Sequence, residues 1–332
     1  MKTVILGFSG GVDSAVCAVL LRKNGYAVKG VYLDNTDAAA RKSAEEVAEF
    51  IGIPLIILDV RQELEEKVCK PFTENYLSGK TPNPCILCNP ALKFRKLFSV
   101  AEENGADAIA TGHYARVIEG KLFRGNSEND QSYMLCRLTR EQLNRLILPL
   151  GVYPKKEVRA MAAEFALPVA NKPDSMEICF IPDKDYISWL RSRAVLPPPG
   201  PLFLHGREIG QHQGIVCYTV GQRLPGLYDG RKVYISKINA VDNSIELAWW
   251  EELFRTEILA ENFNWLCDIP AGDFSASVRV RHTKWETPNC HVHINADGSV
   301  RIQCEESVRA PAAGQSAVLY SGEQVLGGGF II

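Results

Sequence analysis

The sequence predicts an α/β fold in its first half, with a doubly wound and mostly parallel sheet, followed by a small linking module and a C-terminal all-β barrel. Strand-like and helix-like segments alternate with short connections up to about residue 113. The run LPPPGP, residues 196–201, can continue neither a helix nor a central strand. Short alternating runs separated by turn signals follow it. We therefore expect domains over 1–195, 200–255 and 256–332.

The elements of the first half follow from apolar runs and the residues that end them. Continuous apolar stretches predict buried strands at 3–8 and 28–33. Helical patterns over 13–24 and 38–51 stop at Gly25 and Gly52, as helices commonly do. Two more strands, at 54–60 and 107–113, and a helix after Asn89 complete the alternation that predicts a parallel sheet.

The last third alternates apolar and polar residues, as antiparallel strands do. Residues 277–282 read SVRVRH, which places Arg279 and Arg281 on one face and Val278 and Val280 on the other. Hairpin turns are expected at residues 297–298 and 321–322, an Asp-Gly and a Ser-Gly pair. The sequence thus predicts a small barrel.

Composition limits the classes of function. The chain has 332 residues, 46% of them hydrophobic and 23% charged, which is ordinary for a soluble globular protein. Its formal charge of −2 gives no general attraction for nucleic acid, so such a partner would need a local basic patch. No stretch approaches the ~20 apolar residues of a membrane helix, and the ten cysteines are too scattered for a secreted disulfide framework. A cytoplasmic protein without a membrane partner is expected.

The stretch SGGVDS, residues 9–14, lies between the first strand and the first helix. Ligands bind at the carboxyl ends of parallel strands. Gly10 and Gly11 let backbone N–H groups approach an anion, and the helix N-terminus adds a positive partial charge. Hydroxyls at Ser9 and Ser14 add donors. Since neither GxxxxGK[ST] nor GxGxxG is present, the pattern indicates a phosphate-binding loop of another kind.

A second stretch with chemical potential is PCILCNP, residues 84–90. Asn89 followed by Pro90 is a strong helix start, which would place Cys88 just outside a helix N-terminus. The positive end of the helix dipole there favours a thiolate. Cys85 and Cys88 alone are too few to hold zinc. Cys179, at the end of a strand-like run, is the candidate third cysteine.

The other cysteines have no predicted chemistry. We expect several of them to be small buried hydrophobes because their neighbours are apolar or strand-like. These are Cys17, Cys136, Cys217, Cys267 and Cys304. Cys69 and Cys290 have no partner at an informative spacing.

A series of motifs in order along the chain makes the sequence recognisable. They are SGGVDS, GKTPNP, LCN with LKF, TGHYAR, DQSYML, LPLG, DSMEICFI, YTVGQR, GQSAVLY and LGGG. With them the chain resembles the tRNA-specific 2-thiouridylases of the MnmA/TrmU family, within the PP-loop ATP pyrophosphatases. The resemblance implies ATP-dependent thiolation of a tRNA wobble uridine at C2, with Mg²⁺ and a sulfur donor.

The resemblance also implies residue roles. Cys88 matches the nucleophile and Cys179 the cysteine that bears the persulfide, with a Cys88–Cys179 disulfide after sulfur release. The positions matching ATP contacts are Gly7, Phe8, Ser9, Gly10, Gly11, Val12, Asp13, Ser14, Leu33 and Gly112, with Asp13 helping to hold Mg²⁺. The positions matching tRNA contacts are Asn83, Pro84, Cys85, Asn129, Asp130, Gln131, Arg281 and His282. In this context the face of Arg279 and Arg281, with Lys284 nearby, is expected to contact phosphates. His113 is expected to be a core histidine satisfied by the backbone.

Departures from the family pattern leave alternatives open. Cys85 replaces the usual aspartate, so Cys85, Cys88 and Cys179 can be read as three ligands of a 4Fe-4S cluster that carries sulfide, whereas a persulfide relay needs only two cysteines. Asn129 replaces a lysine, His282 a tyrosine, and DSMEIC replaces DSTGIC. A synthetase that adenylates a carboxylate is one rival function. A non-catalytic RNA-binding or cluster-sensing protein is another.

Overall fold

A parallel sheet lies in the N-terminal half of the chain. The computed structural model describes residues 1–35, 37–126, 128–174, 178–181, 184–227, 230–269, 271–283 and 285–332. The sheet has the order β3-β2-β1-β4-β7, and every pairing in it is parallel. Its strands are β1 (Thr3–Gly7), β2 (Ala27–Asp34), β3 (Leu55–Asp59), β4 (Ala108–Ala110) and β7 (Leu146–Ile147). The predicted doubly wound sheet is confirmed, and β7 is a strand that the sequence did not reveal.

Helices cover both faces of this sheet. Helices α1 (Val12–Lys23), α2 (Ala38–Ile51) and α8 (Lys155–Glu164) pack against Val4 and Leu6 of β1. Helix α6 (Arg95–Glu103) packs on the other face, against Ile5. Because neighbouring strand residues point to opposite faces, a continuous apolar strand serves two cores. This explains why the sequence shows an unbroken apolar run there.

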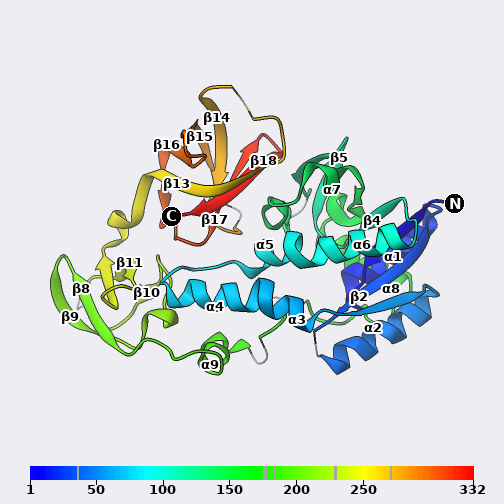
Figure 1. Ribbon diagram of the computed structural model, residues 1–332, viewed down its shortest axis with the longest axis horizontal. Coiled ribbons are helices and arrows are strands. Elements are labelled where there is room, and N and C mark those ends of the chain that lie inside the picture. The colour runs from blue at the N-terminus through cyan, green and yellow to red at the C-terminus, as the bar shows by residue number, and fades with distance from the viewer. Residues whose placement is uncertain are drawn as a thin grey trace.

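Two longer helical stretches contain π-helical turns. Helix α3 (Arg61–Leu64) continues through η1 (Glu65–Cys69) into α4 (Lys70–Leu77), and α5 (Pro84–Cys88) continues through η2 (Asn89–Phe94) into α6. Figure 1 shows these stretches running between the parallel sheet and the strands β8 to β11 at the far end of the molecule. The remaining helical elements are η3 (Ser132–Leu135), α7 (Arg140–Asn144), η4 (Pro149–Val152), α9 (Tyr186–Arg191), η6 (Ile215–Cys217) and η7 (Trp250–Leu253).

A second sheet of order β10-β11-β12-β8-β9 follows the proline-rich run. It consists of β8 (Gly200–Leu204), β9 (Arg207–His212), β10 (Arg223–Leu224), β11 (Val233–Asn239) and β12 (Ser244–Ala248). Its apolar side chains share one core with Phe72 of α4 and Trp189 of α9. The sheet is therefore attached to the helices that leave the N-terminal sheet.

The C-terminal strands close into a barrel, as predicted, because β13 pairs with both β16 and β18. They are β13 (Phe254–Trp265), β14 (Phe274–Arg279), β15 (Thr287–Ile294), β16 (Val300–Arg309), β17 (Ser316–Ser321) and β18 (Gln324–Ile331). The predicted two-residue turn at 297–298 is wrong, because Ile294 pairs with Val300 and leaves a longer loop. The turn predicted at 321–322 is shifted by one residue, since Ser321 pairs with Gln324.

A hairpin from the N-terminal half extends the barrel's sheet. Strands β5 (Ala115–Ile118) and β6 (Lys121–Arg124) form this hairpin, and Phe123 pairs with Gln324 of β18. The barrel is thus joined by main-chain pairing to a hairpin that the N-terminal half of the chain supplies. None of the helices in the described ranges is long and apolar enough to cross a membrane.

Candidate active site

The predicted phosphate-binding loop connects β1 to α1 at a switch point of the sheet. Strand β1 pairs with β2 on one side and β4 on the other, so the strand order reverses beside it. Gly10 has a φ of +68°, and a Cβ there would lie 2.5 Å from Ala44 Cα. A Cβ on Gly112, after β4, would lie 3.2 Å from Asp13 Cβ. Glycine is therefore required where the loops and α2 approach one another.

Asp13 is held by two groups that the sequence analysis missed. The Tyr114 hydroxyl donates to its Oδ1 at 2.7 Å, and Lys155 Nζ donates to both carboxylate oxygens at 2.7 and 2.8 Å. Lys155 also pairs with Asp174 at 2.8 Å, as Arg159 does. Burial, and then the charge of Asp13, raise the pKa of Tyr114, so its hydroxyl remains a donor. Helix α8 thus places the ammonium group of Lys155 next to Asp13, the one carboxylate of the loop.

The loop hydroxyls are engaged within the loop itself. Ser14 Oγ donates to the carbonyl of Gly11 at 3.1 Å, and the N–H of Ser9 donates to Ser14 Oγ at 3.3 Å. These contacts fix the turn ahead of α1. Leu33, the other residue expected near ATP, lies on β2. The expected nucleotide contacts therefore come from three neighbouring strands, β1, β2 and β4, at one edge of the sheet.

The helix that carries Cys85 and Cys88 begins earlier than predicted. Asn83 is its N-cap, since its side chain accepts from the N–H of Cys85 at 3.2 Å, and Pro84 is the first helical residue. Asn89 has helical angles and donates through Nδ2 to the carbonyl of Met134 at 2.9 Å. The prediction that Asn89 caps the helix and leaves Cys88 outside its N-terminus is therefore wrong.

Cys88 is consequently not a dipole-stabilised thiolate. Burial raises the pKa of its thiol to about 11; Lys93 lowers it, and the charges of Cys179 and Cys85 raise it. Lys93 lies one helical turn beyond, in η2, and is the cation whose charge lowers the pKa of Cys88. The sequence analysis missed Lys93, although it stands in the LKF motif.

Cys179 lies at the same edge of the sheet as Cys88. Its carbonyl accepts from Nδ2 of Asn35, which directly follows β2, at 3.3 Å. The residue is exposed, yet burial of its sulfur raises the pKa of the thiol while Lys93 lowers it. The charge of Cys179 in turn acts on Cys88, and all ten cysteines are free thiols. The thiol of Cys179 is therefore close enough to Cys88 for its charge to raise the pKa of Cys88.

The segment around Cys179 is not the strand that was predicted. Residues 178–181 form a turn, and residues 175–177 and 182 of the same motif lie outside the described residues. Within the described ranges, no three histidine, cysteine, aspartate or glutamate side chains converge as metal ligands would. In this conformation Cys85, Cys88 and Cys179 do not form a preassembled cluster site.

His113 faces the same edge from the end of β4. Its Nδ1 lies 2.7 Å from Thr111 Oγ1, and its ring stacks on Phe94 with centroids 5.9 Å apart. Burial, and then Lys93, hold the pKa of His113 well below its usual value. The imidazole is therefore neutral, and Nδ1 bonds to the Thr111 side chain rather than to the expected backbone group.

Removing the charge of Lys93 is expected to slow alkylation of Cys88. In the wild type, the rate constant for reaction with iodoacetamide should rise about tenfold per pH unit between pH 7 and 9, because the pH is then far below the pKa of the thiol. Lys93→Met should raise that pKa further and lower the rate at pH 8 by about three- to tenfold. Peptide mass spectrometry measures the rate for Cys88 alone. Arg95→Met, which removes an exposed charge two residues away, should leave it unchanged; equal effects of both variants would contradict the role of Lys93.

The residues expected to contact tRNA are largely engaged within the protein. Asp130 pairs with Arg279 at 2.6 Å, and both side chains are less than one-tenth exposed. Arg279 is therefore paired inside the protein and not on a solvated face. Arg281 donates through Nη2 to the carbonyls of Val220 and Ala310, at 2.6 and 3.0 Å.

The neighbours of this pair are also anchored. His282 Nε2 lies 3.1 Å from the carbonyl oxygen of Asp130, and Gln131 Oε1 accepts from the N–H of Tyr114 at 3.0 Å. Asn129 lies within the described part of the chain and Lys284 outside it. Strand β14 ends at Arg279, short of the run predicted up to residue 282, and Val278 is buried as expected. The alternation in the sequence indicated a strand but not its burial between domains.

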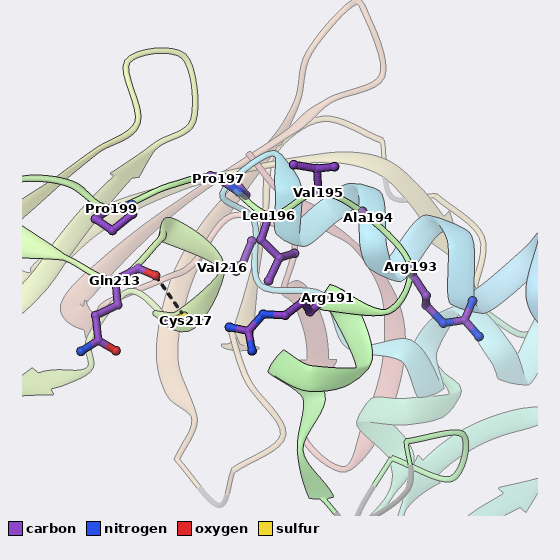
Figure 2. A pocket seen from close by; sticks show the side chains of 10 residues that line it. All are labelled: Arg191, Arg193, Ala194, Val195, Leu196, Pro197, Pro199, Gln213, Val216 and Cys217. Atoms are coloured by element: carbon purple, nitrogen blue, oxygen red, sulfur yellow. Dashed lines mark hydrogen bonds between the residues drawn. The ribbon is translucent and has the colours of Figure 1, made fainter.

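A separate cavity lies at the end of α9. Figure 2 shows it between that helix and the segment around η6, with a volume of about 710 Å³. Cys217 at its wall donates to the carbonyl of Gln213 at 3.8 Å. Cys217 and Cys267 are only partly buried, unlike the prediction, whereas Cys17, Cys136 and Cys304 are buried. The cavity is lined by Arg191, Arg193, Ala194, Val195, Leu196, Pro197, Pro199, Gln213, Val216 and Cys217, none of which was a predicted site residue.

Family models match three successive parts of the chain. They are the tRNA methyl transferase HUP domain over residues 2–183, the tRNA methyl transferase PRC-barrel domain over 201–248 and the aminomethyltransferase beta-barrel domain over 255–331. The first of them spans more than half of the chain, including the glycine loop and both site cysteines.

Curated relatives match the chain from end to end. The tRNA-specific 2-thiouridylase MnmA of Syntrophotalea carbinolica is 39% identical over 347 residues, covering 99% of this chain and 98% of the relative. That of Carboxydothermus hydrogenoformans is 40% identical, covering 99% and 97%, and that of Rickettsia typhi 38%, covering 100% and 99%. Since these matches cover nearly the whole length of the chain and of each relative, the chain belongs to the MnmA family of tRNA-specific 2-thiouridylases.

Proposed function

We propose that this enzyme uses ATP to thiolate the wobble uridine of tRNA at C2. Residues 1–195 would bind ATP and hold the cysteines, 200–255 would link, and 256–332 would take part in holding the RNA. The observation that supports the proposal is a pair of thiols, Cys88 and Cys179, whose pKa values the charge of Lys93 lowers against the effect of burial, with the Cys179 carbonyl bonded to Asn35 just after β2. A carboxylate-amidating synthetase has no use for two such thiols.

The first half-reaction activates the base. The uridine O2 attacks the α-phosphorus of ATP, pyrophosphate leaves, and the base carries an adenylate on O2. The backbone between Gly7 and Ser14 would hold the phosphates, at the N-terminus of α1. Mg²⁺, when bound, neutralises phosphate charge, and Asp13 is the carboxylate of the loop that would coordinate it. Because Lys155 donates to both carboxylate oxygens of Asp13, Asp13 would have to bind Lys155 and the Mg²⁺ ion at the same time.

The second half-reaction transfers sulfur. A persulfide donor first places a sulfane sulfur on Cys179. The terminal sulfur of this persulfide then forms the bond to C2 as AMP leaves with the O2 oxygen. The Cys88 thiolate attacks Cys179 Sγ, which breaks the bond to the transferred sulfur and leaves a Cys88–Cys179 disulfide. A dithiol reductant returns both thiols for the next turnover. Lys93 favours the thiolate form of both cysteines.

The RNA would reach this site over the cysteine helix and the loop after β6. Asn83, Pro84 and Cys85 begin that helix, and Cys85 is exposed. A wobble base lies in a single-stranded loop, so it is splayed out more readily than a paired base. Arg281 and His282 on the barrel would lie close to the same strand of RNA. The segment of Asn129, Asp130 and Gln131 would lie between these two residues and the cysteine helix.

A test with purified protein separates this function from its rivals. Wild-type enzyme, ATP, a persulfide donor and an unmodified tRNA transcript should give one 2-thiouridine and one pyrophosphate per turnover, measured by nucleoside mass spectrometry and a phosphate assay. Pyrophosphate release that depends on ammonia and a carboxylate would instead identify a synthetase. Tight tRNA binding with no pyrophosphate would identify a non-catalytic protein. Anaerobic purification with iron and sulfide counts should give less than about 0.1 iron per chain; four irons with activity that depends on them would select the cluster route on Cys85, Cys88 and Cys179.

A further inference from the structure

Asp130 is fully used by contacts inside the protein. Besides pairing with Arg279 at 2.6 Å, its Oδ1 accepts from the N–H groups of Gly125 and Ser132, at 2.9 and 3.0 Å. Its Oδ2 accepts from Ser132 Oγ at 3.0 Å. A carboxylate with this many donors has little capacity left for RNA. Its partner Arg279 comes from the barrel, 149 residues further along the chain.

A second ion pair, which is only partly buried, adjoins the first. Arg124 of β6 pairs with Glu286, which also lies 3.6 Å from Arg279 Nε. Both guanidinium groups lie over the ring of Tyr320, with distances to its centroid of 4.2 Å for Arg124 and 5.2 Å for Arg279. Removing one member of such a network leaves a buried charge uncompensated, so the network admits few relative positions of hairpin and barrel.

The residues next to Asp130 reach the nucleotide loop. Gln131 makes two hydrogen bonds to Tyr114: its N–H donates to the Tyr114 carbonyl at 2.8 Å, and its Oε1 accepts the Tyr114 N–H at 3.0 Å. Tyr114 then donates to Asp13 at 2.7 Å. An unbroken chain of contacts therefore runs from Arg279 on the barrel to the carboxylate of the phosphate-binding loop.

The same segment also holds the cysteine helix. The carbonyl of Met134 accepts from Asn89 Nδ2 at 2.9 Å, and Met134 Sδ lies 3.4 Å from Asn83 Nδ2. Between these contacts, the Tyr133 hydroxyl donates to the carbonyl of Ser316 in the barrel at 2.9 Å. Residues 130–134 therefore contact the barrel, the cysteine helix and Tyr114, which in turn binds Asp13 of the phosphate-binding loop.

We propose that Asp130 and Arg279 are positioning residues that set residues 130–134, and through them Asp13 and the cysteine helix, and that neither side chain binds RNA. The inference rests on the proposed function only in taking tRNA as the substrate. The pair keeps the phosphate-binding loop and the cysteine helix at fixed positions relative to the barrel.

The test compares a variant without both charges with a matched control. Asp130→Asn with Arg279→Met removes the ion pair and keeps an acceptor for Gly125 and Ser132. Glu323→Gln removes an exposed pair, Arg116–Glu323 at 2.9 Å, that crosses the same junction of hairpin and barrel. For the double variant we expect kcat for 2-thiouridine formation to fall at least about tenfold and exchange of the Tyr114 amide hydrogen to accelerate at least about tenfold. The control should change neither more than about twofold.

Salt dependence of tRNA binding decides whether Arg279 contacts RNA. A lost phosphate contact would reduce the slope of log K against log salt by about one. We expect the slope to stay unchanged in the double variant, and a reduction of about one would overturn the inference, as would unchanged Tyr114 exchange. If the double variant fails to fold, Arg279→Lys, which keeps the charge but not the planar fork, replaces it for the amide-exchange measurement, and unchanged Tyr114 exchange in that variant would overturn the inference. Absence of thiolation by wild type would refute the proposed function, while amide exchange at Tyr114 still tests the positioning role.

Discussion

Replacing Cys88 with serine should abolish 2-thiouridine formation, with a loss of at least about 10³-fold, equivalent to about 4 kcal/mol in the activation barrier. A serine hydroxyl has nearly the size of the thiol but cannot open a persulfide at neutral pH. ATP binding and tRNA-dependent pyrophosphate release should stay within about threefold of wild type, because the glycine loop and Asp13 are untouched. Nucleoside mass spectrometry and pyrophosphate assays on the same reaction separate the two half-reactions.

Cys85→Ser is the matched control for this experiment. Cys85 lies one turn before Cys88 on α5 and is exposed, so its replacement disturbs packing little. The persulfide route predicts at most about a threefold loss in this variant. A loss as large as that of Cys88→Ser would favour a three-cysteine cluster. Thiolation at the wild-type rate by Cys88→Ser would refute the sulfur chemistry altogether.

Local patterns predicted the N-terminal sheet well. The strand predicted at 3–8 is Thr3–Gly7, and the helix predicted at 38–51 is Ala38–Ile51. These elements combine a strong apolar pattern with glycine at their ends, so that propensity and tertiary packing agree. The barrel was also predictable as a set of alternating strands. Its pairing with the hairpin β5–β6 was not, since one register pair, Phe123 with Gln324, leaves no periodic signal.

The start of the cysteine helix shows how two equal local signals mislead. Asn83-Pro84 and Asn89-Pro90 both have the composition of an N-cap followed by a first helical residue. The structure uses the first pair and accommodates the second inside the helix, in the π-helical turn Asn89–Phe94. A proline lacks the N–H of a regular helical hydrogen bond, and a π-helical turn interrupts the regular bonding. The sequence therefore indicated a helix start beside the cysteines but not which of the two Asn-Pro pairs forms it.

Contacts between distant residues account for the rest of the site. Lys155 is 142 residues from Asp13, and Arg279 is 149 residues from Asp130. Alternation along SVRVRH is the same whether the polar face meets water or another domain, so burial of Arg279 could not be inferred from it. Lysine at the first position of α8 likewise looks like any solvated helix residue.

Replacing Lys155 with methionine is expected to lower kcat/KM for ATP in pyrophosphate release by about 10²- to 10³-fold. Asp13 is a carboxylate in a loop that should bind a phosphate chain, and the negative charges of carboxylate and phosphate repel each other. Lys155 neutralises it through contacts of 2.7 and 2.8 Å to both oxygens. Without the ammonium group, the loop presents an uncompensated negative charge to the nucleotide. Initial rates at varied ATP, with tRNA saturating, measure the loss.

The double variant Asp13→Asn with Lys155→Met distinguishes charge neutralisation from direct contact of Lys155 with phosphate. If neutralisation is its task, removing the carboxylate as well should restore part of the ATP affinity, and the two substitutions will not be additive. If Lys155 grips the phosphate itself, the double variant should be no better than the single one. Arg159→Met is the control, because Arg159 shares Asp174 with Lys155, and it should cost less than about threefold. A similar loss in Arg159→Met would mean that anchoring of Asp174, rather than the charge beside Asp13, determines the activity of the loop.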